Sequence, residues 1–139
     1  MFSTDDIERG IRAQCVEEGK AAEERDRLVK WFASPRPRTV VEKTCASLVQ
    51  THGMWIHRTT METAFYAAGG KTAPGNHMTT HASHRYGKGV TEYPPYIKQA
   101  DHSYALNPTV ASAVRWLIQQ RTRKLTAEAV ALQAMAIIF

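Results

Sequence analysis

The chain of 139 residues has the length of one ordinary domain. Its apolar fraction of 43% and charged fraction of 22% are those of a folded globular protein, which excludes disorder along the whole chain. A formal charge of +5, from 18 Lys and Arg residues against 13 Asp and Glu residues, excludes an acidic mimic of DNA and favours a polyanionic partner.

The charge is divided unevenly along the chain. Residues 1–34 hold eight acidic and six basic residues, whereas residues 35–139 hold five acidic residues, twelve basic residues and all six histidines. We therefore predict an N-terminal helical arm, residues 1–34, and a basic helical body, residues 35–139, and we expect the body to contact any anion. The acidic start lacks a signal-peptide pattern and no apolar window approaches about 18 residues, so we expect a cytoplasmic protein without membrane contact.

The first predicted element is one long helix over residues 4–33. Ser3 or Thr4 is placed to cap it, and its apolar residues fall near one face. Apolar ends and a charged centre predict an arm that packs on its own body or on a second copy. Residues 34–38, Ser-Pro-Arg-Pro-Arg, end the helix and form a basic linker. Cys15 and the later Cys45 lie among apolar neighbours, and we expect both to be reduced and buried.

Two shorter helices are predicted over residues 40–52 and 60–68. Thr39 is placed to cap the first of them. Thr59 and Glu62 have capping-box spacing at the second, and the Gly-Gly pair at residues 69–70 ends it.

Residues 69–107 have the composition of an irregular insertion, with five of the eight glycines and four of the five tyrosines. One helix is expected inside it, over residues 77–86, followed by a loop with or without a short β-ribbon. A long irregular segment in a compact domain tends to be functional or mobile.

The last third of the chain predicts two more helices. The first starts at Asn107-Pro108 and runs to about residue 120, because an N-cap residue followed by proline favours a helix start. Residues 121–124 are a basic break, and residues 127–139 form a last helix that is apolar almost all round. Such a helix must be buried, either in the core or in a second copy. The predicted fold is therefore all-α, with about five to six helices.

One part of the body resembles a known DNA-binding family. The string from Leu48 to Gly53, with residues 59–62 and 67–69, resembles the first two helices of a TetR-type helix-turn-helix domain over about 30 residues. Phe65 and the long turn over residues 69–75 depart from that pattern. The resemblance implies that residues 77–86 are a recognition helix, with Met78, Ala82 and Tyr86 toward the core. The side chains implied to contact the groove or the phosphates are Thr80, His81, His84 and Arg85.

Further contact residues are predicted from charge and aromatic content. The basic candidates for contact with nucleic acid or an acidic partner are Arg36, Arg38, Lys43, Lys88, Arg115, Arg121, Arg123 and Lys124. A mixture of tyrosines and bases, which also includes Lys98 and Tyr104, offers Tyr86, Tyr93 and Tyr96 as residues that stack on bases. The alternative is that these tyrosines attach an irregular segment to the core and leave their hydroxyls in water.

A histidine cluster gives the candidate metal ligands. His77, His81 and His84 lie at i, i+4 and i+7 of the predicted helix, and His102 or Asp101 would complete a zinc site. The alternative is a polar helix face of neutral histidines, and no cofactor is expected because the spacing matches none of the known zinc signatures.

These patterns lead to three functional hypotheses. The first is a small basic regulatory protein that binds nucleic acid and forms a homo-oligomer through residues 4–33 or the last helix. The second is a small inhibitor or adaptor that docks on an acidic surface of a larger protein or nucleoprotein complex. The third is a zinc-dependent enzyme that uses the three-histidine face. No nucleophile elbow, phosphate loop or paired acidic motif occurs, so no enzyme is expected.

Overall fold

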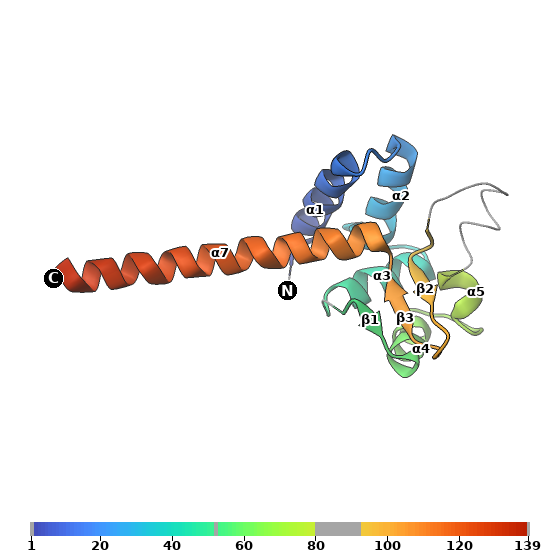
Figure 1. Cartoon of the computed structure of the whole chain (residues 1–139). Coiled ribbons are helices and arrows are strands. Elements are labelled where there is room, and N and C mark those ends of the chain that lie inside the picture. The colour runs from blue at the N-terminus through green and yellow to red at the C-terminus, as the bar shows by residue number, and fades with distance from the viewer. Residues whose placement is uncertain (1, 52, 80–92, 139) are drawn as a thin grey trace.

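Most of the described chain is helical, and one small antiparallel sheet lies within it (Figure 1). The computed structural model describes residues 2–51, 53–79 and 93–138. In chain order the elements are α1 (Thr4–Glu17), α2 (Ala22–Phe32), α3 (Val40–Val49), β1 (Trp55–Ile56), α4 (Arg58–Ala67), α5 (Gly75–Met78), β2 (Tyr96–Lys98), β3 (Tyr104–Leu106) and α7 (Pro108–Ile138). The prediction of a mostly helical protein is confirmed, but the sheet was not part of the predicted all-α class.

The N-terminal region forms two helices, so the predicted single helix over residues 4–33 is wrong. The break lies at Gly19, whose φ of 66° is in the left-handed region that glycine adopts without strain. The N–H of Lys20 donates to the carbonyl of Cys15 at 2.9 Å, and the N–H of Gly19 donates to that of Val16 at 3.2 Å. These two bonds form a Schellman motif that ends α1, and α2 then packs back against α1.

The predicted caps of the next two helices have different outcomes. The Thr39 cap is confirmed at the start of α3, where Thr39 Oγ1 accepts a hydrogen bond from the Glu42 N–H at 3.1 Å. Glu42 Oε2 also accepts a hydrogen bond from the Thr39 N–H at 2.9 Å, which completes a capping box that was not predicted. The second predicted cap is wrong, because α4 begins two residues earlier than predicted, at Arg58. Its cap is His57, whose Nδ1 accepts a hydrogen bond from the Thr59 N–H at 3.2 Å.

The three strands pair in the order β1-β3-β2, and both pairs are antiparallel. Trp55 lies opposite Ala105 in the first pair, and Tyr96 lies opposite Leu106 in the second. Both β2 and β3 fall inside the region that was predicted to be irregular. The β2–β3 hairpin follows α4 and α5 in the chain and lies beside α5 (Figure 1).

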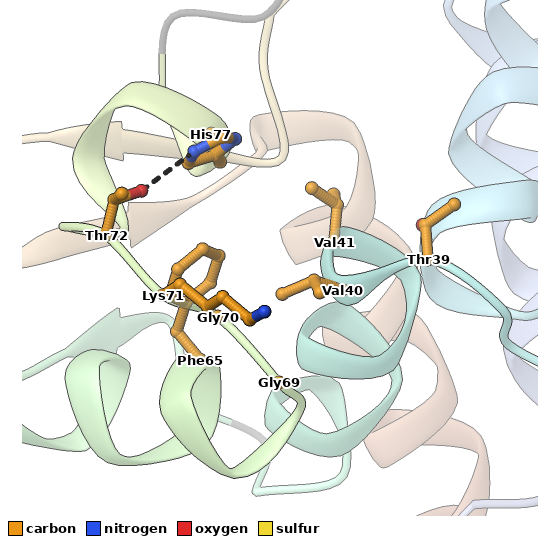
Figure 2. A pocket seen from close by; sticks show the side chains of 9 residues that line it. All are labelled: Thr39, Val40, Val41, Phe65, Gly69, Gly70, Lys71, Thr72 and His77. Atoms are coloured by element: carbon orange, nitrogen blue, oxygen red, sulfur yellow. Dashed lines mark hydrogen bonds between the residues drawn. The ribbon is translucent and has the colours of Figure 1, made fainter.

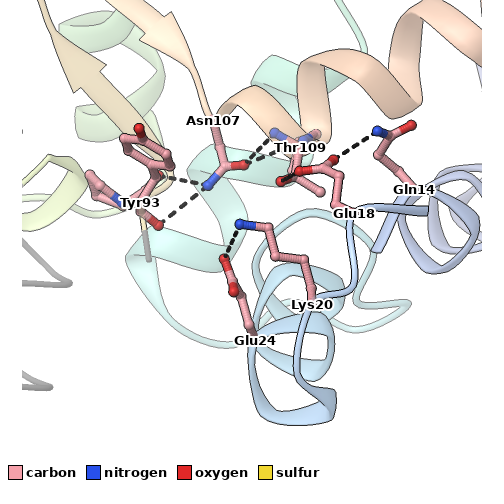
Figure 3. Close-up of polar contacts among 9 residues, drawn as sticks. Gln14, Glu18, Lys20, Glu24, Tyr93, Asn107 and Thr109 are labelled. Carbon is pink, nitrogen blue, oxygen red and sulfur yellow. Dashed lines mark hydrogen bonds and ion pairs between the residues drawn. The ribbon is translucent and has the colours of Figure 1, made fainter. Parts of the chain in front are cut away.

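The C-terminal region is one helix of 31 residues, so the predicted basic break at residues 121–124 is wrong. The predicted start is confirmed, because Asn107 Oδ1 accepts hydrogen bonds from the N–H groups of Thr109 at 3.0 Å and Val110 at 3.3 Å. Thr109 Oγ1 also donates to Glu18 Oε1 at 2.9 Å, which ties the start of α7 to the end of α1 (Figure 3). Asn107 Nδ2 donates to the Tyr93 carbonyl at 3.3 Å and so holds the segment before β2.

One apolar core is formed by residues of α1, α2, α3, α4 and α5, of the sheet and of the first part of α7. Cys15 and Cys45 are both free and buried in it, as predicted. The core prediction for the last helix is wrong for the single chain, because residues 118–136 of α7 are exposed. The C-terminal part of this helix projects away from the other elements (Figure 1). Among the described residues, no helix combines the length and the apolarity needed to cross a membrane.

Candidate nucleic-acid interface

The first basic group of the candidate site lies at the start of α4. The capping bond of His57 fixes the first turn of this helix, and Arg58 follows directly on its exposed side. Arg58 Nε donates to Glu62 Oε1 at 2.9 Å, one helical turn further along. This hydrogen bond and the charge of Glu62 raise the pKa of the Arg58 guanidinium. Glu62 thus orients Arg58 through Nε, and the guanidinium carries further N–H groups that can donate to an anion.

The turn after α4 brings a second group of polar side chains together. Gly69 has a φ of 103°, and the N–H of Gly70 donates to the Phe65 carbonyl at 2.9 Å, so the chain reverses tightly at the end of α4. A side chain at Gly70 would overlap the Phe65 ring, which explains the second glycine. The Lys71 side chain then extends toward α3, across the groove that this turn leaves open (Figure 2).

This groove has a volume of about 470 Å³ and lies between the start of α3 and the turn. On its far side the His77 ring stacks on Phe65, with ring centroids 5.7 Å apart, and His77 Nε2 shares a hydrogen bond with Thr72 Oγ1 at 3.1 Å (Figure 2). The residues that line the groove are Thr39, Val40, Val41, Phe65, Gly69, Gly70, Lys71, Thr72 and His77.

The β2–β3 hairpin supplies the third basic group. Asp101 accepts hydrogen bonds from the Ser103 N–H at 3.0 Å and the Ser103 hydroxyl at 2.6 Å, and these bonds lower the pKa of its carboxyl. They fix a turn in which His102 has a φ of 67°, a conformation that is uncommon for a residue with a side chain. Lys98 is the last residue of β2 and stands on the other side of the same turn.

Arg58, Lys98 and His102 line one pocket of about 280 Å³ at the start of α5. We call this pocket the α4–hairpin cleft; its full lining is Arg58, Glu62, Ala73, Pro74, Gly75, Lys98, His102 and Tyr104. Three cationic or protonatable side chains, one from α4 and two from the β2–β3 hairpin, therefore line one hollow together with Glu62. Arg58 and His102 are brought together because β1, which precedes Arg58, pairs with β3.

The predicted basic contacts lie on other elements. Arg36 and Arg38 are exposed in the segment between α2 and α3, and Lys43 is exposed on α3. Four more are exposed along α7, namely Arg115, Arg121, Arg123 and Lys124. Arg121 lies over the Phe2 ring at 3.9 Å, which places it beside the N-terminus. The structure therefore distributes these predicted contacts over three parts of the chain, and none of them lines the α4–hairpin cleft.

The remaining predictions concern aromatic and histidine residues. Tyr93 is exposed, whereas Tyr96 is fully buried in the core and so presents no ring at the surface. Met78 is buried, as the expected recognition helix required, but α5 ends at that residue in the described structure. The predicted contacts Thr80, His81, His84, Arg85, Tyr86 and Lys88 lie outside the described residues.

Among the described residues, no group of three or more His, Cys, Asp or Glu side chains is placed to hold a metal ion. His77 contacts Phe65 and Thr72 in the groove, and His102 lies in the hairpin turn. The other two candidate zinc ligands, His81 and His84, are outside the described part, so the three-histidine site stays a prediction.

Sequence reasoning did not select Arg58 or His102 as a contact, although it named His102 as a candidate metal ligand. Two local signals were available for them. One is the histidine cap that precedes Arg58, and the other is the Asp-His-Ser sequence that forms the hairpin turn. Comparison with protein-family models finds no match for the chain, and comparisons with curated proteins and with solved structures likewise find none.

Proposed function

We propose that this protein binds nucleic acid and contacts its phosphate backbone with the α4–hairpin cleft. The observation that carries the proposal is the convergence of Arg58, Lys98 and His102 on one hollow. Guanidinium and ammonium groups from separate elements are the usual donors to phosphate oxygens, and they fix the register of a protein on its nucleic acid.

The order of the elements around the cleft supports the same function. A helix, α4, is followed after a turn by α5, and a β-hairpin comes next in the chain and packs beside α5. In helix-turn-helix proteins the second helix enters the major groove while neighbouring segments contact the backbone. The cleft includes Gly75, the first residue of α5, and we therefore assign it the role of such a backbone contact in the proposed complex.

The charge distribution over the chain favours this side of the molecule. Eight of the 13 acidic residues lie in residues 1–34, which form α1 and α2, and the cleft lies among elements of the basic remainder. Attraction of a polyanion is therefore stronger toward the part of the protein that carries the cleft.

The direct test is the salt dependence of binding. The protein is titrated against labelled duplex and single-stranded DNA, and the logarithm of the affinity is plotted against the logarithm of the salt concentration. We expect Lys98→Ala to weaken binding to every sequence and to reduce the slope by about one unit, the effect of one lost phosphate contact. The matched control is Lys30→Ala, an exposed lysine on α2 that does not line the cleft, which should leave both quantities unchanged. Salt-independent binding, or equal effects of the two variants, would refute the proposal.

A second candidate function is docking on an acidic protein surface. It is favoured by the exposed cations Arg121, Arg123 and Lys124 on α7, which stand apart from the cleft. A single protein partner, retained after nuclease treatment and lost when these three residues are replaced by Ala, would support this function over the first.

A further inference from the structure

The C-terminal half of α7, residues 118–136, carries large apolar side chains that its own chain does not cover. Leu125 is 60% exposed and Leu132 is 66% exposed. The first residues of this half lie beside the N-terminus, where Arg121 covers the Phe2 ring, and beyond them no described element lies beside the helix in Figure 1. Soluble proteins rarely expose a long run of large apolar side chains unless it binds something, so this half of the helix requires a partner.

Six residues on one side of this segment alternate between large and small side chains along the helix. Large residues recur every seven positions, and small residues recur every seven positions, four places after each large one. Positions with these spacings lie on one strip of a helix surface. The large residues are Ile118, Leu125 and Leu132, and the small ones are Thr122, Ala129 and Ala136.

We propose that this strip pairs with the same strip of a second copy of the chain, in an antiparallel pair centred on Ala127. In this register every large side chain faces a small one. Ile118 lies against Ala136 of the second copy, and Leu125 lies against Ala129 of the second copy. The two-fold symmetry repeats each contact, so the strip is complementary to itself, as a closed dimer requires.

The one polar side chain of the strip is compatible with burial. Thr122 lies against Leu132 of the second copy in this register. Its hydroxyl donates to the Ile118 carbonyl of its own helix at 3.0 Å. A hydroxyl whose donor is already satisfied enters an apolar interface at little cost, because no hydrogen bond is lost.

The charges of the segment select the antiparallel orientation. Three cations, Arg121, Arg123 and Lys124, lie close together, whereas residues 129–136 carry no charge. A parallel pair would place the cations of both copies side by side. The antiparallel register sets each group against uncharged residues and separates the centres of the two groups by about 13 Å along the axis. That distance exceeds the screening length of roughly 8 Å in physiological salt.

The first experiment measures the oligomeric state by sedimentation equilibrium over the micromolar range. We expect a dimer for the full chain and a dissociation constant raised about tenfold or more by Leu125→Glu. The matched control is Val130→Glu. Val130 is also 60% exposed, but it lies about 130° around the helix from the strip, so its replacement should leave the dimer intact.

The second experiment tests the orientation by disulfide cross-linking. A mixture of the Ile118→Cys and Ala136→Cys variants should cross-link, whereas Ala136→Cys alone should not, because its two copies lie at opposite ends of the pair. The parent chain is the control for Cys15 and Cys45, which are buried.

Three results would overturn the proposal. The first is a monomer at every concentration, as expected if α7 binds a different protein or a lipid surface. The second is equal dissociation of the Leu125→Glu and Val130→Glu variants. The third is cross-linking of Ala136→Cys by itself, which requires a parallel pair.

Discussion

Replacement of Tyr96 by Phe should stabilise the protein. The Tyr96 side chain is fully buried, and its hydroxyl has no hydrogen-bond partner among the described residues. Burial raises the pKa of this phenol well above its ordinary value, so it stays neutral. An unsatisfied buried hydroxyl costs about 1–3 kcal/mol of desolvation. Phe removes that cost and keeps the ring contact with Phe32, whose centroid lies 6.0 Å away.

The expected gain in the free energy of unfolding is therefore about 1–3 kcal/mol, which corresponds to roughly 4 °C in Tm for each kcal/mol. Urea and thermal unfolding followed by circular dichroism measure both quantities. Tyr66→Phe is the matched control, because Tyr66 is 49% exposed and its hydroxyl is open to water. Nucleic-acid binding should be unchanged in Tyr96→Phe, since the ring is absent from the surface. A loss of stability would refute the reasoning, because it would show that the hydroxyl is bonded.

Three further predictions concern the fold around the candidate site. Gly70→Ala should lower the free energy of unfolding by about 1–3 kcal/mol, because the added Cβ overlaps the Phe65 ring; unchanged urea unfolding would show that the turn relaxes instead. Burial raises the pKa of Glu42, but hydrogen bonds from Thr39 outweigh it and hold the pKa below its ordinary value of 4.5. The stability lost in Glu42→Gln, about 1 kcal/mol at neutral pH, should therefore disappear as the pH falls through the lowered pKa, and a pH-independent loss would contradict this. Burial also raises the pKa of Cys45, so a thiol reagent should modify it only after unfolding, and prompt reaction of the folded protein would show that the thiol is accessible.

The helices were predictable where a local signal is strong. Thr39 with Glu42 and Asn107 with Pro108 mark helix starts through side chains that satisfy nearby N–H groups, and the structure contains both. The break at Gly19 was missed because a single glycine also occurs inside helices, as Gly10 does in α1. The positive φ at Gly19 distinguishes this helix-ending glycine from Gly10 inside α1, and that angle depends on how α2 packs.

The strands could not be predicted from periodicity. With two or three residues each, β1, β2 and β3 are too short to show an alternating pattern, and they form because they pair with one another. The cleft depends on the same pairing. Arg58 and His102 are far apart in the sequence, and the alignment of Ile56 with Tyr104 brings them to one pocket. The candidate site could therefore not be predicted from the distribution of charge along the sequence.

The predicted break in α7 failed for a related reason. Charge alone does not interrupt a helix, and the sequence contains neither glycine nor proline between Thr109 and Ile138. The helix therefore runs without interruption from the core into solvent.

Because α7 is continuous, the direction of its exposed strip relative to the core depends on the number of residues between them. Because 3.6 residues complete one turn, a single residue inserted after Gln119 would rotate everything beyond it by about 100° relative to the core. The strip that contains Leu125 and Leu132 would keep its own pattern but face a new direction. Two residues inserted would turn it almost to the opposite side, and seven would restore its direction and lengthen the helix by about 10 Å. The direction in which this protein presents its C-terminal surface is thus set by the number of residues between the core and Leu125.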